Sequence, residues 1–243
     1  MIYFLDTTDY ILKNWKAVFY TEPILLITLI GALIITLKFR NGQKSLTLIP
    51  FYIGLFIIEI FSEWLAAFVH YHQIFNPKEF DFVSYLDYLL TVIELLTFVI
   101  FFYSEIKNNR SKSVLLILTL LFCIYSLLEL LLNPEFPRSV SDNTQSRVYT
   151  LESIILLLGC TFYFIQTFRA LPFTNIKREP SFWIATGLLY FFSCTLPYSL
   201  IENYLRENHY QLMLKFYSIF YLFYILLFYM IIKAYLCQRK KLI

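Results

Sequence analysis

Seven long apolar runs, separated by short polar stretches, dominate the pattern of the chain. A helix needs about 20 mostly apolar residues to cross the hydrocarbon core of a bilayer. Runs of about that length lie at residues 22–39, 47–71, 84–106, 113–132, 150–170, 181–203 and 211–236. The pattern predicts an all-α integral membrane protein, a seven-transmembrane-helix bundle that forms a single membrane domain over residues 1–243. Because the connections are short, neighbouring helices are expected to run antiparallel.

The segment before the first run has a different pattern. Residues 9–20 place Ile11, Trp15 and Phe19 on one helical face, with charged side chains elsewhere. An amphipathic helix of this kind can lie in the plane of a membrane interface. We therefore expect residues 1–21 to form an outer interfacial segment.

The distribution of basic residues predicts the orientation of the bundle. The first, third and fifth loops and the C-terminal tail hold thirteen Lys and Arg residues, whereas the N-terminal segment and the other loops hold six. Lys and Arg are enriched in cytoplasmic loops. The bias predicts that the N-terminus lies outside and the C-terminus lies in the cytoplasm.

Composition agrees with a membrane location and excludes some partners. Hydrophobic residues make up 59% of the 243 residues and charged residues 15%, against about 45–50% and about 25% in soluble domains. The net charge is +3 and no Lys/Arg run forms a binding stripe, which argues against nucleic acid as a partner. The use of Ile, Phe, Tyr, Asn and Lys fits a bacterial gene. We expect a multi-pass protein of the bacterial inner (plasma) membrane.

Acidic side chains interrupt the apolar runs. Glu59 and Glu63 are four residues apart in the second run, and Asp87 and Glu94 are seven apart in the third, so each pair shares a helical face. With the predicted orientation, these acids fall between the middle of the membrane and its outer side. A charge at that depth costs at least about 2.5–3.5 kcal/mol. We therefore expect Asp87 and Glu94 to face a polar pocket that opens outward.

Other charged residues fall at the same outer ends. The candidate ligand-binding residues are Glu59, Glu63, Asp87, Glu94, Arg147, Glu152, Glu202 and Lys215. Two simpler interpretations stay open: acids near helix ends can reach interfacial water, and protonated acids can tie helices together by hydrogen bonds. The pair His70 and His72 has a poor spacing for one metal ion on a helix, so no metal site is expected.

Several chemistries lack their required residues. A retinal protein needs a Schiff-base lysine in the middle of the seventh run, where the sequence reads "YSIFYLFYILL". Membrane zinc hydrolases need an HxxxH pair on the last helix, which is absent. No GxSxG, HExxH or phosphate-binding loop occurs. No cofactor is expected, and an enzyme is the least favoured class.

The fifth and sixth runs carry the most distinctive sequence, "RVYTLESIILLLGCTFYFIQTFRALP" from Arg147 to Pro172 and "PSFWIATGLLYFFS" from Pro180 to Ser193. This text resembles a group of small, uncharacterised seven-helix membrane proteins of Bacteroidota-type bacteria. The resemblance covers these two stretches and otherwise only the topology. The resemblance implies an association with histidine-kinase signalling.

Two classes of function fit these patterns. The first is a receptor-like membrane sensor or signalling subunit, whose outward acidic pocket binds a small polar or cationic ligand and reports to a partner at the basic cytoplasmic face. The second is a cation- or proton-coupled transporter or channel that uses the membrane-embedded glutamates. The inner half of the runs holds few charges, which favours the sensor, because a conducting path needs polar groups across the whole depth. An intramembrane enzyme comes third.

Overall fold

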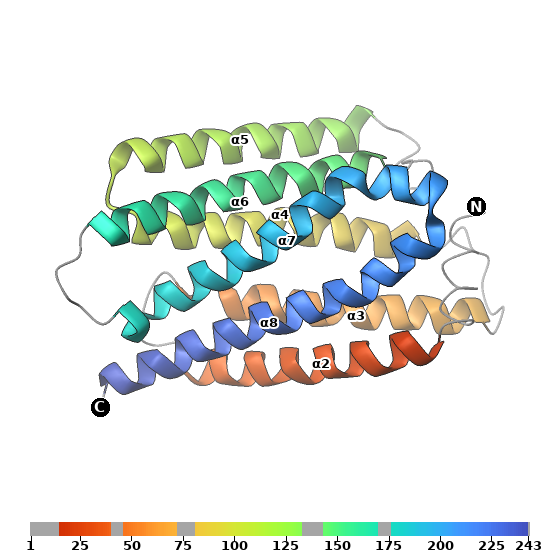
Figure 1. The fold of residues 1–243 in the computed structure, drawn as a ribbon, viewed down its shortest axis with the longest axis horizontal. Coiled ribbons are helices and arrows are strands. Elements are labelled where there is room, and N and C mark those ends of the chain that lie inside the picture. The colour runs from red at the N-terminus through yellow and green to blue at the C-terminus, as the bar shows by residue number, and fades with distance from the viewer. Residues whose placement is uncertain (1–14, 40–45, 72–80, 133–142, 170–175, 243) are drawn as a thin grey trace.

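The computed structural model describes residues 15–39, 46–71, 81–132, 143–169 and 176–242 (Figure 1). These residues form seven α-helices and one short 3-10 helix. The bounds are α2 Trp15–Lys38, α3 Ile49–Tyr71, α4 Asp81–Glu105, α5 Asn109–Leu132, α6 Asn143–Arg169, η4 Ile176–Arg178, α7 Pro180–Asn208 and α8 Tyr210–Leu242. All seven predicted runs are therefore helical. Residues 1–14 of the expected interfacial segment lie outside the described residues.

Five helices of the described part are long and apolar enough to cross a bilayer. The qualifying stretches are Tyr85–Glu105, Asn109–Leu132, Arg147–Arg169, Pro180–Glu202 and Ile219–Cys237. The apolar stretches Pro23–Lys38 of α2 and Ile49–Ser62 of α3 are shorter. The chain is a multi-pass, all-helical membrane protein.

Helix α2 begins earlier than the apolar pattern predicts. The first run starts at residue 22, but the helix starts at Trp15 and continues through Pro23. A proline removes one backbone hydrogen bond from a helix, and in membrane bundles neighbouring helices and local adjustments satisfy the freed carbonyl. The hydropathy pattern therefore marks the apolar part of α2 and not its start.

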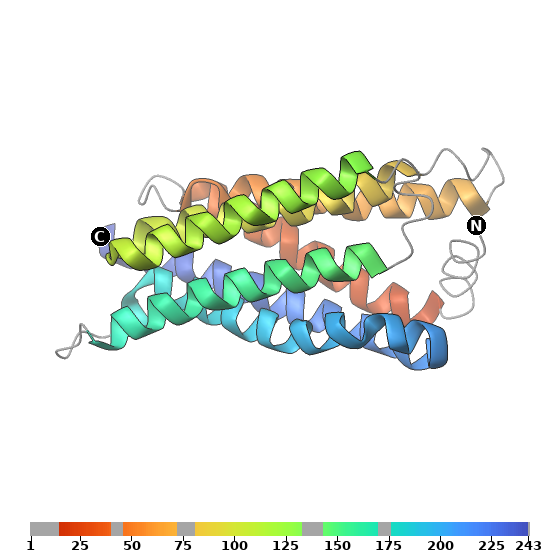
Figure 2. The same ribbon diagram turned by 90° about the horizontal axis from the view of Figure 1, so that it is seen from above.

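Six of the helices form a closed ring, and α5 lies outside it. Around the ring α2 packs on α3, α3 on α4, α4 on α6, α6 on α7, α7 on α8 and α8 on α2 (Figure 1). Helix α5 packs against α4 and α6; it is the top helix in Figure 1 and lies nearest the viewer in Figure 2. Its buried residues Leu115, Thr119, Phe122 and Ser126 are spaced by four, three and four, which is a single helical stripe. Its other faces expose leucine and isoleucine, as expected for a helix that borders lipid.

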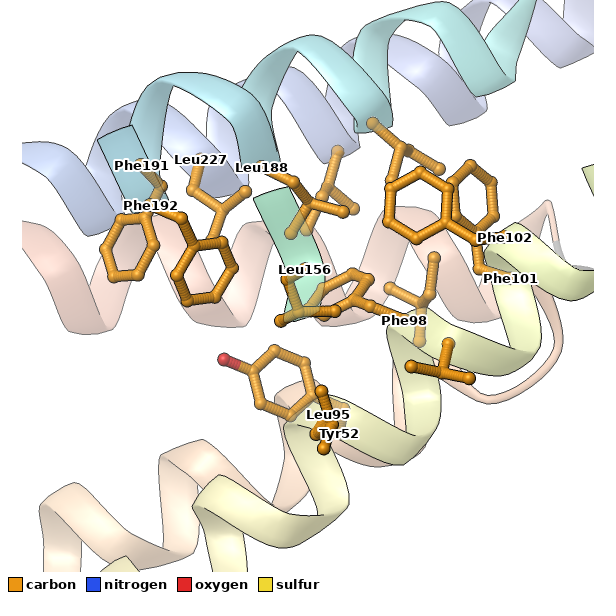
Figure 3. Packing of buried hydrophobic residues seen from close by; sticks show 14 of the residues in the cluster. Tyr52, Leu95, Phe98, Phe101, Phe102, Leu156, Leu188, Phe191, Phe192 and Leu227 are labelled. Atoms are coloured by element: carbon orange, nitrogen blue, oxygen red, sulfur yellow. The ribbon is translucent and has the colours of Figure 1, made fainter. Parts of the chain in front are cut away.

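Large aromatic side chains fill the interior of the ring. Phe98, Phe101 and Phe102 of α4 are fully buried (Figure 3), as is Phe228 of α8, and we call these four residues the aromatic floor. The rings of Phe101 and Phe102 lie edge to face with centroids 5.1 Å apart, an arrangement that aromatic pairs prefer. Helix α6 passes this layer at Gly159, whose missing side chain leaves room for the ring of Phe102.

One end of the bundle is formed by the C-termini of α2, α4, α6 and α8, and we call it the basic end. Side chains fix its connections. The Gln166 side chain accepts a hydrogen bond from the backbone N–H of Lys107 and donates one to the Glu105 carbonyl at 3.2 Å. The Tyr235 hydroxyl donates to the Leu46 carbonyl at 2.6 Å. Lys233 Nζ lies 3.4 Å from the centre of the Trp183 ring, a cation–π contact.

Candidate functional site

Four glutamates from four helices are buried in the bundle. The exposed fractions are 6% for Glu59 of α3, 6% for Glu94 of α4, 2% for Glu152 of α6 and 8% for Glu202 of α7. Glutamate is almost never fully buried in proteins unless it has a partner. A group of buried acids inside an apolar bundle is therefore the most unusual chemical feature of the described structure.

Three of these acids gather around tyrosines in the middle of the ring. Tyr224 of α8 interacts electrostatically with Glu94, Glu152 and Glu59, and also with Asp87. Glu152 interacts in turn with Glu94 and Asp87. The acids of α3, α4 and α6 therefore converge on one place, which the helix contacts of the ring make possible.

Two further tyrosines complete the group. Tyr52 of α3 interacts with Glu94 and Glu152, and Tyr149 of α6 interacts with Asp87. We define the acid–tyrosine cluster as Tyr52, Glu59, Asp87, Glu94, Tyr149, Glu152 and Tyr224. The cluster draws on four helices of the ring, α3, α4, α6 and α8.

Helical spacing explains how α3, α4 and α6 each contribute two groups to the cluster, whereas α8 contributes Tyr224. Tyr52 and Glu59 are seven residues apart, as are Asp87 and Glu94, and seven residues make nearly two turns. Tyr149 and Glu152 are three residues apart on α6, which also places them on one face. The acids were predicted because they interrupt apolar runs, whereas the tyrosines were missed because Tyr occurs 20 times in the chain. Only a search for tyrosines spaced three, four or seven residues from the acids could have found them.

Three polar atoms of the cluster are buried without a hydrogen bond. Within the described part of the chain, Glu94 Oε1, Glu152 Oε1 and the Tyr52 hydroxyl have no hydrogen-bond partner. The Tyr52 hydroxyl interacts with Glu94 but falls outside the distances and angles of a normal hydrogen bond. A buried polar atom without a partner costs about 1–3 kcal/mol, and more when it is charged. Native structures keep few such atoms, and those they keep call for an explanation.

Fully buried apolar side chains close the cluster toward the basic end. Tyr52 packs edge to face on Phe98 with ring centroids 5.5 Å apart, and Phe228 stacks on Tyr52 and on Tyr224 at 6.4 and 6.3 Å. In Figure 3 the Tyr52 hydroxyl points away from Phe98, Phe101 and Phe102. The polar group of the ring therefore faces the acids, and the aromatic floor separates the acids from the basic end.

The other predicted site residues have different surroundings. Arg147 is exposed and interacts with Tyr125, whose hydroxyl donates to Glu129 Oε1 at 2.8 Å. Glu202 is buried near the C-terminal end of α7. Glu63 lies in α3 and Lys215 in α8, but their side chains are outside the described residues.

The donor set of the described residues does not form a multidentate metal site. Within those residues, no group of three or more His, Cys, Asp and Glu side chains is arranged to hold a metal ion. His209 caps the end of α7 and lies against Tyr204, with ring centroids 6.0 Å apart. The acid–tyrosine cluster instead offers carboxyl and hydroxyl oxygens, and these can bind or exchange a small cation.

No protein-family model, no curated protein and no solved structure matches the chain. The resemblance to small seven-helix membrane proteins, and its link to histidine-kinase signalling, therefore stays a prediction from the sequence of α6 and α7.

Proposed function

We propose that the chain is a seven-pass protein of the bacterial inner membrane that acts as a sensor or signalling subunit. The acid–tyrosine cluster is its ligand site, and a small polar or cationic ligand enters from the outer side. The observation that carries the proposal is the difference in polarity between the two sides of the aromatic floor. Acids with unpaired oxygens lie on one side of the aromatic floor, and tightly packed apolar side chains lie on the other.

The depth of the acids supports entry from the outer end. Asp87 is partly exposed and lies six residues from the start of α4, whereas Glu94 is buried about 10 Å further along the helix. Exposure thus falls along α4 in the direction of the aromatic floor. A ligand that enters beside Asp87 reaches Glu94 before it meets the floor.

The basic end is suited to report a change in the bundle. Its connections are tied to helices that surround the cluster: Gln166 of α6 holds the α4–α5 turn, and Tyr235 of α8 holds Leu46 before α3. A shift of α6 or α8 at the cluster therefore moves the connections at this end. The proposed reader of that movement is a cytoplasmic or membrane partner such as a histidine kinase.

The orientation can be tested by cysteine labelling. Ser141→Cys and Lys240→Cys are introduced singly into a chain without its four native cysteines, and intact cells are treated with a membrane-impermeant maleimide. Because the basic loops are expected in the cytoplasm, position 141 should react in intact cells and position 240 only after lysis. Labelling at position 240 in intact cells would reverse the orientation and the direction of ligand entry.

A transporter or channel is the second candidate, favoured by the unpaired carboxyl oxygens in the middle of the bundle. The aromatic floor argues against it, because an apolar barrier makes the passage of ions costly. We expect the purified protein in liposomes to show no proton, sodium or potassium flux above that of empty vesicles. Robust flux that disappears in Glu94→Gln would make the transporter the preferred function.

A further inference from the structure

Glu94 and Glu152 stand out within the cluster because both are buried and both have an unpaired oxygen. They project from α4 and α6, which pack directly against each other, and they interact electrostatically. Two carboxylates at close range cannot both stay charged without compensation in an apolar interior. The two carboxylates therefore need a compensating positive charge.

The described neighbours of the pair do not supply that charge. Glu94 interacts with Tyr52 and Asp87, and Glu152 interacts with Glu94 and Asp87. The described basic side chains that have contacts lie elsewhere, with Arg147 beside Tyr125 and Lys233 over Trp183. The pair is surrounded by hydroxyl and carboxyl oxygens, the ligands that hard cations prefer.

Tyr52 provides an independent indication of a ligand at the same place. Its side chain is fully buried, and its hydroxyl has no hydrogen-bond partner among the described residues. The hydroxyl belongs to α3, a third helix, and its strongest side-chain interaction is with Glu94. Aromatic neighbours hold the ring of Tyr52, and its hydroxyl interacts with a carboxylate but makes no hydrogen bond. The hydroxyl is therefore positioned to coordinate a bound group.

We infer that Glu94 and Glu152, with the Tyr52 hydroxyl, bind one small monovalent cation, either a proton or Na⁺, inside the ring. This inference rests on the proposed function for the cluster as the ligand site, and it names the class of ligand. A single positive charge shared by the two carboxyl groups removes their repulsion and gives each unpaired oxygen a partner.

The surroundings select for a small cation with one charge. Leu95, Phe98 and Leu156, which adjoin the pair, are fully buried, so the ligand is expected to enter without its hydration shell. Ca²⁺ takes six to eight oxygens and Mg²⁺ a near-ideal octahedron, and no three acids among the described residues are arranged as ligands of one metal ion. The titratable groups around the pair are Tyr52, Glu59, Asp87, Tyr149 and Tyr224.

Thermal unfolding of the whole protein in detergent, with two separate titrations, tests the inference. In one, NaCl replaces choline chloride at constant ionic strength and pH. In the other, the pH is lowered from 8 to 5 without Na⁺. A ligand that binds only the folded state raises the melting temperature in a saturable way. Saturable stabilisation by NaCl identifies Na⁺, and stabilisation by acid alone identifies the proton.

Matched variants assign the response to the pair. Glu94→Gln and Glu152→Gln keep the shape of the side chain and should each abolish the response. Glu129→Gln, which changes an acid bonded to Tyr125 away from the pair, should leave it intact. Tyr52→Phe should shift the midpoint by about threefold or more. The Na⁺ concentration at the midpoint should rise because an oxygen ligand is lost, whereas the proton concentration at the midpoint should fall because the hydroxyl no longer favours a charged carboxylate.

The outcomes separate this inference from the proposed function. A wild-type protein that responds to neither titration, or a response that survives in both Gln variants, overturns the cation site and leaves the sensor proposal standing. If a Gln variant does not fold, an unchanged midpoint in Tyr52→Phe overturns it. A Na⁺ response together with Na⁺ flux in liposomes keeps the site and overturns the sensor.

Discussion

Replacement of Gly159 by leucine is expected to prevent the bundle from folding or to destabilise it by about 3 kcal/mol or more. A Cβ atom at position 159 would lie 2.7 Å from Cδ2 and 3.0 Å from Cε2 of Phe102. Phe102 is fully buried in the aromatic floor, so its ring has little room to move. Inserting extra carbon atoms into a packed interior typically costs about 1–3 kcal/mol, and leucine adds four.

Gly54 is the matched control for this substitution. It also lies inside a helix of the ring, but nothing lies within 4 Å of a Cβ atom at that position. Gly54→Leu should therefore fold, and Gly54→Ala should be stabilised by up to about 1 kcal/mol because alanine is a better helix former than glycine. The measurement is the yield of monodisperse protein and its unfolding in a detergent titration. Equal behaviour of Gly159→Leu and Gly54→Leu would contradict the close contact between α4 and α6.

The second large effect is a gain in stability when the buried acids are removed together. The double variant Glu94→Leu/Glu152→Leu is expected to raise the free energy of unfolding by about 2–4 kcal/mol. Leucine has a similar size, and it replaces two carboxyl groups that each have an unpaired buried oxygen. Exchange of buried charged groups for apolar ones of similar volume is often stabilising by about 1–4 kcal/mol.

The same variant should lose any response to Na⁺ or acid. Stability is to be compared with the wild type in choline chloride at pH 8, the condition of the two titrations in which a bound cation contributes least. A loss of several kcal/mol would instead show that the acids hold the helices together by hydrogen bonds, which is the structural interpretation that the sequence leaves open. The variant thus separates a functional cluster from a structural one.

The positions of the helices could be predicted from the sequence, with errors at their ends. The second run was expected at 47–71 and α3 spans Ile49–Tyr71, and the fourth was expected at 113–132 and α5 spans Asn109–Leu132. The fifth was expected to begin at residue 150, but α6 begins at Asn143. Hydropathy detects the part of a helix that suits hydrocarbon, whereas the helix itself continues through polar residues at its ends.

The site could be predicted only in part. The acids stood out because charge is rare in apolar runs, and their spacing placed them on shared faces. The predicted set nevertheless joined residues that the structure separates: Arg147 lies with Tyr125 and Glu129, whereas Glu152 lies with Glu94. Tyr52 and Tyr224 were not expected, because an aromatic residue suits the lipid interface, the core and a polar site equally well.

The sequence by itself determined that the chain is a helical membrane protein, where its helices lie, and which acids are unusual, because the cost of burying backbone and charge in lipid leaves a strong pattern. Only the tertiary structure decided which helices are neighbours. Residues that face lipid and residues that face the interior are both apolar, so hydropathy does not distinguish them. The ring of six helices, the place of α5 outside it and the meeting of Glu94 with Glu152 depend on close contacts such as Gly159 against Phe102, which no local pattern reveals.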